Sequence, residues 1–242
     1  KQQMMAQDSL GQTSLSKVTF VAKGVVIYTL FFELIGVIIL STSFIPIYGF
    51  DRGLYYSIFY SISAFNNAGF SLFNNSLINF QGHYLICLTI STLYTLGGIG
   101  FLVLIDVKQN KRWNKLTPNS KLILSAIATL NIVAFILIWL LEANNPLTLG
   151  SMNIGEQAMN AWFQATVPRS SGFNTIDTGS MEHSTTLLTM LLMFIGGGSL
   201  STAGGIKVGT FIIVVLSVIT FLRRSEELTV FNHSVSKTTS FK

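Results

Sequence analysis

Charged residues are scarce in this sequence. Asp, Glu, Lys and Arg make up only 10% of its 242 residues, apolar residues make up 50%, and the mean hydropathy is +0.56. Soluble domains carry roughly 25% charged residues, so a soluble globular class is excluded. The single cysteine, Cys87, excludes an intrachain disulfide framework and any zinc or iron–sulfur site built from several cysteines. We therefore expect an integral membrane protein whose fold rests on packing in lipid.

The sequence also lacks the patterns of catalysis. No acid/base pair, nucleophile constellation or phosphate-binding glycine loop stands in a suitable setting. His83 and His183 have no second ligand at helical spacing, which disfavours zinc. We therefore expect no enzyme activity and no covalently bound cofactor.

Four apolar stretches reach the roughly 20 residues that cross a bilayer as a helix. They are residues 23–45, 84–107, 122–141 and 185–222. The third has no charged residue and follows a Thr-Pro-Asn-Ser segment in which Asn119 or Ser120 is a candidate helix cap. The expected fold class is all-α, integral to the membrane and multi-pass.

The positive charge lies mostly on one side of these stretches. If they alternate in direction, twelve of the fifteen Lys and Arg residues share a face: Lys1, Lys17, Lys23, Lys108, Lys111, Arg112, Lys115, Lys121, Arg223, Arg224, Lys237 and Lys242. Such an excess marks the cytoplasmic side, so we expect a plasma-membrane protein with both ends of this chain cytoplasmic. The charge flanks spans and forms no separate basic patch, which disfavours a nucleic-acid partner.

The opposite face is acidic. Its carboxylates can concentrate cations outside the membrane, although a solvated surface explains most of them equally well. They are Asp51, Glu142, Glu156, Asp177 and Glu182.

Two connections on this acidic face are too apolar to be simple turns. Residues 55–64 and 155–167 are predicted to form helices of about three turns, roughly 15 to 20 Å, which cannot span the membrane. Each must begin and end outside, so each is predicted to be a re-entrant helix followed by an extended ascent. Non-helical backbone at membrane depth is tolerated where it is buried in protein or lines a water-filled cavity. Two interfacial helices lying flat are the alternative.

The re-entrant helices belong to an internal repeat. At an offset of 103 residues, Phe59 matches Trp162, Ser63 matches Thr166, Gly69 matches Gly172 and Phe70 matches Phe173. At an offset of 107, residues 95–99 match residues 202–206. Each unit then contains a span, a pore helix, an extended loop and a span, and two such units predict a pseudo-axis along the membrane normal. Chance similarity of glycine-rich apolar sequence is the alternative.

This repeat predicts five parts of the chain. They are a cytoplasmic linker (1–20), the first repeat (21–107), a basic cytoplasmic loop (108–121), the second repeat (122–222) and a cytoplasmic tail or linker (223–242).

Each short helix is followed by polar residues and a glycine. Glycine enters positive φ freely, so it allows successive carbonyls to turn toward one axis. Rings of such carbonyls replace the water shell of a cation in potassium-channel filters. We expect Arg169 behind the filter, paired with Glu156 or Asp177. The predicted filter residues are Asn66, Asn67, Ala68, Gly69, Arg169, Ser170, Ser171 and Gly172.

The last apolar stretch is too long for one straight span. Residues 185–222 would form a helix of about 57 Å, almost double a hydrocarbon core of about 30 Å. An unwound segment at membrane depth must face the pathway, whereas glycines for close helix packing are the alternative. Lys207 either plugs the pore as a tethered cation or extends to the inner face. The predicted gating loop comprises Gly196, Gly197, Gly198, Ser199, Ser201, Thr202, Ala203, Gly204, Gly205 and Lys207.

Residues 63–70, 166–175 and 196–207 resemble motifs of the Ktr/Trk/HKT superfamily of potassium transporters, and are most similar to the bacterial Ktr membrane subunit. The resemblance covers almost the whole chain. That family carries four span, pore loop, span units around one ion pathway, whereas this sequence contains two, which resemble the second and third. The chain is then either a fragment, which we favour, or a half-length subunit.

The resemblance implies that K+ binds to backbone carbonyls of a potassium-channel-like filter and that the glycine-rich loop is a gate. It implies K+ as the transported ion, a homodimer and a cytoplasmic nucleotide-binding regulatory ring, which would contact residues 108–121 and 223–242. A sodium-permeable transporter of the same family and a non-conducting membrane scaffold are the alternatives. The implied K+ ligands are the carbonyls of Asn67, Ala68, Gly69, Ser170, Ser171 and Gly172.

Overall fold

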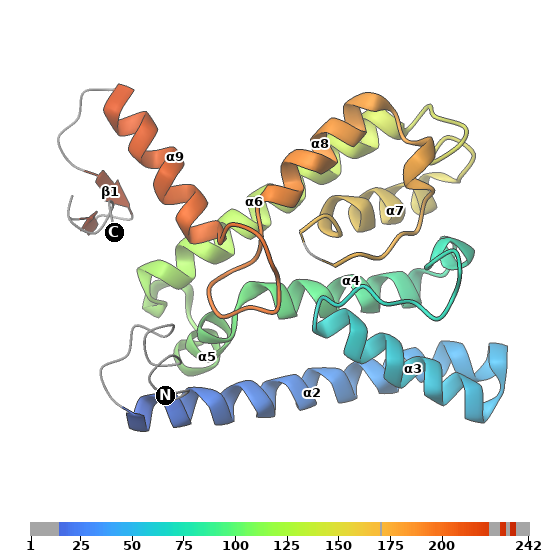
Figure 1. Ribbon diagram of the computed structural model, residues 1–242, viewed down its shortest axis with the longest axis horizontal. Helices are drawn as coiled ribbons and strands as arrows, with labels where there is room; N and C mark the ends of the chain where they lie inside the picture. The colour runs from blue at the N-terminus through green and yellow to red at the C-terminus, as the bar shows by residue number, and fades with distance from the viewer. Residues whose placement is uncertain (1–14, 170, 223–227, 231–232, 236–242) are drawn as a thin grey trace.

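The computed structural model describes residues 15–169, 171–222, 228–230 and 233–235 (Figure 1). The helices are α2 (Leu15–Tyr48), α3 (Phe50–Phe65), α4 (Tyr84–Ile99), α5 (Phe101–Asn110), α6 (Pro118–Glu142), α7 (Ile154–Thr166), α8 (His183–Phe194) and α9 (Val208–Leu222). Short 3-10 turns lie in the connections: η1 (Ile78–Phe80), η2 (Trp113–Lys115) and η3 (Thr178–Ser180). Residues 15–222 are therefore built on helices, as expected.

A small hairpin departs from the all-α expectation. Strand β1 (Leu228–Val230) pairs antiparallel with β2 (His233–Val235). Thr and Val are frequent in this segment, and such β-branched residues favour strands. The rest of the predicted tail, and residues 1–14 of the predicted linker, lie outside the described residues.

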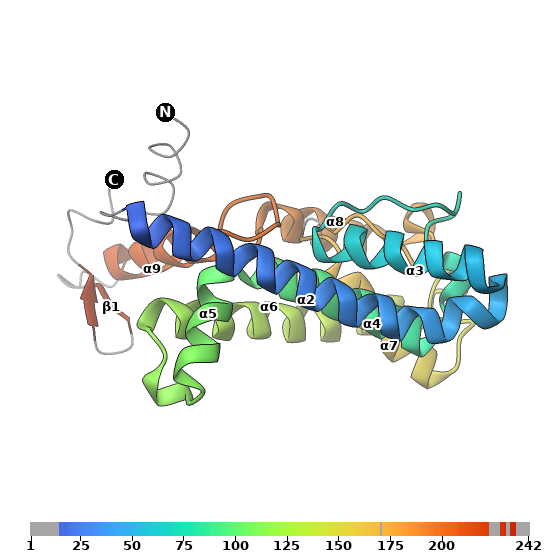
Figure 2. The same ribbon diagram turned by 90° about the horizontal axis from the view of Figure 1, so that it is seen from below.

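Each of the two predicted re-entrant helices is packed between two other helices. Helix α3 contacts α2 and α4, and α7 contacts α4 and α6 (Figure 1). The chain reverses from α2 into α3 at Gly49, whose φ of +81° suits glycine, so α3 runs back alongside α2. This is the arrangement expected of re-entrant helices rather than of helices lying flat on a surface. Figure 2 shows α2 extending along the molecule beside the shorter α3.

Within the described residues, two helices have the length and apolarity of a membrane span, Val21–Tyr48 within α2 and the whole of α6. Their apolar side chains are widely exposed, for example Leu30 (62%) and Leu140 (72%). Such extended exposed apolar surface indicates a membrane-facing region.

The span predicted at residues 84–107 is bent. Helix α4 ends at Ile99, α5 begins at Phe101, and the two axes are bent by 93°. Gly100 at the bend has φ +103°, which only glycine adopts without strain. The amide of Phe101 donates to the carbonyl of Leu200 at 3.2 Å, so the predicted gating loop satisfies the backbone at this break. The pair counts as a third span if it is treated as one broken helix.

The cap of α6 also differs from the expectation of Asn119 or Ser120. Thr117 is the N-cap residue, its hydroxyl accepts from the amide of Ser120 at 3.3 Å, and Pro118 occupies the first turn. Proline suits this position because its missing N–H would have no helical partner there. The Thr117 amide donates to the carboxylate of Asp106 at 2.9 Å, which ties α5 to the start of α6.

The last apolar stretch is broken, as predicted. Helices α8 and α9 have 12 and 15 residues and are separated by residues 195–207. Backbone hydrogen bonds close the base of this loop, from Gly196 N to Ile206 O (2.9 Å) and from Val208 N to Gly197 O (3.0 Å). Each inner helix of the repeat is thus interrupted at a related position, by a bend in the first copy and by a loop in the second.

Aromatic side chains join the two repeats. Tyr60 of α3 stacks on Phe73 with ring centroids 5.5 Å apart and lies 6.2 Å from Phe173, which follows the second short helix. All three rings belong to or pack against one buried cluster. This cluster fixes the two loops that carry the candidate site.

Candidate functional site

The two predicted filter loops meet at their glycines. Gly69 and Gly172 have φ of +70° and +77°. A Cβ atom placed on Gly172 would lie 3.1 Å from the Cα of Gly69, and one placed on Gly69 would lie 2.5 Å from the carbonyl oxygen of Ser171. A side chain at either position would therefore meet both an unfavourable backbone conformation and the opposite chain.

The ascending chains beyond these glycines are also joined. The amide of Leu77 donates to the carbonyl of Asn174 at 2.9 Å, and the amide of Asn174 donates to the hydroxyl of Ser76 at 3.0 Å. The loops of the two repeats consequently form one continuous unit.

In the first filter segment, neighbouring asparagines have different environments. Asn67 is buried, with 9% of its surface exposed, and has φ +51°, a conformation that Asn tolerates better than most residues. Asn66 is exposed, and its amide donates to the carboxylate of Glu33 at 2.7 Å. Ala68 is held by a hydrogen bond from its amide to the carbonyl of Ser63 at 2.9 Å.

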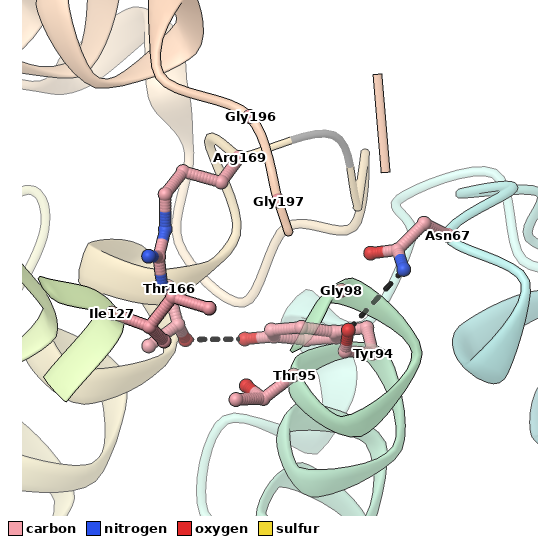
Figure 3. A pocket seen from close by; sticks show the side chains of 9 residues that line it. All are labelled: Asn67, Tyr94, Thr95, Gly98, Ile127, Thr166, Arg169, Gly196 and Gly197. Atoms are coloured by element: carbon pink, nitrogen blue, oxygen red, sulfur yellow. Dashed lines mark hydrogen bonds between the residues drawn. The ribbon is translucent and has the colours of Figure 1, made fainter. Parts of the chain in front are cut away.

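Asn67 connects the first filter segment to two other parts of the chain. Its side-chain amide donates to the carbonyl of Tyr94 at 3.2 Å (Figure 3). It also donates to the hydroxyl of Thr202 at 2.6 Å. Thr202 belongs to the predicted gating loop, 135 positions later in sequence.

In the second filter segment, Ser170 lies outside the described residues. The amide of Ser171 donates to the carbonyl of Val167 at 3.1 Å, and its side chain is fully buried. Its hydroxyl has no hydrogen-bond partner among the described residues.

The expected pairing of Arg169 with Glu156 or Asp177 is wrong. Its guanidinium donates to the side-chain carbonyl of Asn131 on α6 and points away from Asn67 (Figure 3). Glu156 instead forms a capping box with Asn153 at the start of α7. Only 9% of the surface of Arg169 is exposed. The neutral side-chain amide of Asn131 therefore binds a buried guanidinium group. The charge therefore lies on the α6 side of the loop, and its role beside a pathway stays a prediction.

Asp177 forms hydrogen bonds with its own neighbours in the chain. Its carboxylate accepts from the hydroxyl of Ser180 at 2.6 Å and from the amide of Gly179 at 3.1 Å. These hydrogen bonds favour the ionised form, so they lower the pKa of Asp177 below its usual value.

Glu142, predicted as an outer acidic residue, is fully buried at the end of α6. One carboxylate oxygen accepts from Asn145 Nδ2 (2.8 Å) and Thr148 Oγ1 (2.5 Å), and the other from the amide of Glu182 (2.9 Å). This carboxylate holds α6 to the start of α8 and is not available to attract ions.

The predicted gating loop packs backbone to backbone against the end of α4. The amide of Gly198 donates to the carbonyl of Gly98 at 2.8 Å, and the amide of Thr202 donates to the carbonyl of Gly97 at 3.2 Å. A Cβ placed on Gly197 or Gly198 would collide with carbonyls of α4, so the approach requires glycine. The glycines of both segments therefore serve close packing as well as the break.

Lys207 is bound within this loop. Its ammonium group donates to the carbonyl of Ala203 at 2.7 Å. The side chain therefore closes the C-terminal turn of the loop.

A small cavity of about 20 Å³ lies between the filter segments and the gating loop, large enough for about one water molecule (Figure 3). Its lining comprises Asn67, Tyr94, Thr95, Gly98, Ile127, Thr166, Arg169, Gly196 and Gly197.

Three of the residues at or beside this cavity were not identified from the sequence. Tyr94, Thr166 and Asn131 each have an ordinary place in an apolar helix, and their partners lie 38 to 72 positions away. The spacing along one helix carries no signal for such contacts.

Comparisons with known proteins identify the family of this chain. The family described as TrkH, cation transport protein, matches residues 1–239. The Ktr system potassium uptake protein B of Bacillus subtilis is 43% identical over 97% of this chain and 53% of its own length. The protein of the same name from Vibrio alginolyticus is 39% identical over 98% of this chain and 52% of its own length.

A third relative and a solved structure extend the comparison. The potassium/sodium uptake protein NtpJ of Enterococcus hirae is 40% identical over 77% of this chain and 41% of its own length. The crystal structure of the potassium transporter TrkH from Vibrio parahaemolyticus has a TM-score of 0.73 and 19% identity, covering 92% of this chain and 46% of that one. This chain thus spans about half the length of the relatives it matches. The family match over nearly all of its length shows that the chain belongs to the TrkH family of cation transport proteins.

Proposed function

We propose that this chain forms two neighbouring filter units of a pathway for K+ uptake across the membrane. The observation that carries the proposal is the contact between Gly69 and Gly172 at positive φ, which brings equivalent loops of two repeats together. Backbone carbonyls of residues 67–69 and 170–172 are the ligands that would replace the water shell of K+. Relatives that match nearly all of this chain are named as potassium uptake proteins.

Residues 195–207 act in this proposal as a gate beneath the filter. Support comes from their contacts with the filter segment, where the Thr202 hydroxyl donates to the carbonyl of Phe65 and accepts from the side-chain amide of Asn67.

A Na+ permeability is the second candidate. The relative from Enterococcus hirae is named as a potassium/sodium uptake protein, and both ions are bound by oxygen ligands. The comparison of uptake rates for the two ions decides between them.

Two partners are further proposals. We propose that two copies of the full protein associate and that a cytoplasmic nucleotide-binding ring contacts the basic segment 108–121. Lys108, Lys111, Arg112 and Lys115 are exposed there, which supports the second contact. Co-purification of the ring with wild-type protein, and its loss when these four residues are changed to Gln, would test it.

The test of K+ uptake uses the full-length protein that carries this chain, expressed in bacterial cells that lack their own K+ uptake. Gly69→Ala and Gly172→Ala are expected to abolish growth at low K+ because both require positive φ in contact with the other loop. Gly209→Ala is the matched control, since nothing lies within 4 Å of a Cβ at that position. If both filter variants grew as the wild type does, at normal membrane abundance, the assignment of these loops as an ion filter would be refuted.

A further inference from the structure

The hydroxyl of Thr202 is inserted into a socket formed by the first repeat. It donates to the carbonyl of Phe65 at 3.1 Å and accepts from the side-chain amide of Asn67 at 2.6 Å. A Cβ placed on Gly97 would lie 2.8 Å from this hydroxyl, so the wall of the socket fits closely around it. The Thr202 backbone is held as well, through its amide bond to the carbonyl of Gly97.

Both groups that meet Thr202 belong to the end of α3 and the start of the filter segment. Phe65 is the last residue of α3, and Asn67 is the first of the three predicted ion-binding carbonyl residues. The Asn67 side chain is buried, and its conformation at φ +51° is less favourable than that of an extended residue. Hydrogen bonds from its amide therefore help to fix the direction of its backbone carbonyl.

The other hydrogen bonds between the gating loop and the inner helix join backbone atoms to backbone atoms. Gly198 N bonds to Gly98 O, and Leu200 O bonds to Phe101 N, so these contacts join the loop to the inner helix through backbone atoms alone. Among the described residues, the Thr202 hydroxyl is where a side chain of the loop meets the filter segment. A displacement of the loop must break this contact, because Thr202 moves with the loop and Asn67 stays with α3.

We propose that Thr202 is a positioning residue that couples the gating loop to the selectivity filter through Asn67. The inference rests on the proposed function and adds a mechanism to it. With the loop in place, Thr202 fixes Asn67 and thereby the first carbonyl of the filter. Withdrawal of the loop leaves the Asn67 amide without this acceptor and loosens the carbonyl. Opening of the gate and relaxation of the filter are then one linked event.

The transport test measures K+ and Na+ uptake by the full-length protein in cells lacking their own uptake systems. Thr202→Val keeps the shape of the side chain and removes the hydroxyl. We expect about fivefold faster K+ uptake, because the loop leaves its site more easily, and about fivefold lower preference for K+ over Na+, because Asn67 is released. Thr202→Ser should restore both values, since it keeps the hydroxyl. A variant that merely misfolds would lose uptake and leave the preference unchanged.

Thr89→Val is the matched control. Thr89 lies on α4, and its hydroxyl donates to the carbonyl of Leu85 in the same helix at 2.7 Å. The same substitution there removes a hydroxyl without touching the loop. Equal behaviour of Thr202→Val and Thr89→Val would overturn the proposal.

A double variant tests the coupling itself. Asn67→Leu removes the amide, and in its presence Thr202→Val should add little to either effect, because both changes break the same contact. Full additivity of the two substitutions would overturn the proposed coupling.

A second measurement does not depend on transport. A cysteine introduced as Leu200→Cys reports the exposure of the loop to a water-soluble thiol reagent, while the native Cys87 is buried. Asn67→Leu should increase the modification rate about fivefold, and an unchanged rate would overturn the coupling. If the wild-type protein does not carry K+, the proposed function fails, and this rate still decides the coupling.

Discussion

The hydroxyl groups of Tyr94 and Thr166 lie 2.6 Å apart and link the inner helix of the first repeat to the pore helix of the second. The Tyr94 hydroxyl also donates to the carbonyl of Phe163 at 3.3 Å, and both side chains are buried. Since the backbone carbonyl of Tyr94 also accepts from the side-chain amide of Asn67, this residue connects the first filter segment to α7.

We predict that Tyr94→Phe lowers the free energy of unfolding by about 1 kcal/mol, because a buried hydrogen bond between repeats is lost while the ring remains. Thermal unfolding in detergent would measure the change. Tyr55→Phe is the control, because Tyr55 is 57% exposed. The midpoint temperature of unfolding should be lower for Tyr94→Phe than for Tyr55→Phe. Equal midpoints would contradict a stabilising role of the Tyr94 hydroxyl.

Glu142→Gln should destabilise the outer connection between α6 and α8. The buried carboxylate accepts from three donors, and an amide replaces one acceptor oxygen by a donor facing them. We expect a loss of about 2 kcal/mol, measured as the shift of thermal unfolding in detergent. Glu182→Gln, at an exposed side chain, should change stability by less than about 0.5 kcal/mol. A similar effect of both would show that burial of Glu142 contributes nothing.

Gly100→Ala should disturb the bend between α4 and α5. Its φ of +103° is unfavourable for any residue with a Cβ, and the added atom would meet the carbonyl of Ser199. We expect the free energy of unfolding to fall by at least about 1 kcal/mol. We also expect faster proteolysis within the gating loop, because the loop loses its packing against the bend. Limited proteolysis followed by mass spectrometry measures this, with Gly209→Ala for comparison. If the gating loop of Gly100→Ala resisted proteolysis as well as that of the wild type, the bend at Gly100 would not be needed to hold the loop.

Asn131→Leu should leave Arg169 without the partner that the described residues provide. A buried charged donor that loses its acceptor costs about 1–3 kcal/mol or more, so lower thermal stability and lower membrane abundance are expected. Asn131→Asp retains an acceptor at the same place and adds the opposite charge, so it should keep near-normal abundance. If Leu and Asp variants were equally abundant, the contact with Arg169 would not matter for folding.

The class of the fold follows from local features of the sequence. The low charge content and the four apolar stretches predict a helical membrane protein, and the matching loops predict the repeat. The break in the last stretch was predictable too, because its length exceeds one span and glycines destabilise a helix at any depth. The bend at Gly100 was missed because one glycine in an apolar helix is equally compatible with close packing, which does occur at Gly97 and Gly98.

Composition and spacing along the chain determined that this protein is embedded in a membrane, and they predicted an internal repeat and the positions of its two glycine-centred loops. The tertiary structure decided which side chains pair: Thr202 with Asn67, Asn131 with Arg169, and Thr166 of α7 with Tyr94 of α4. The physical reason is the separation along the chain over which each effect acts. Helix length, hydropathy and glycine conformation act within a few residues, whereas a hydrogen bond between buried groups depends on how distant segments pack. Arg169 illustrates the difference, since a position away from the predicted pathway was expected from its charge, but its partner depended on the neighbouring helix.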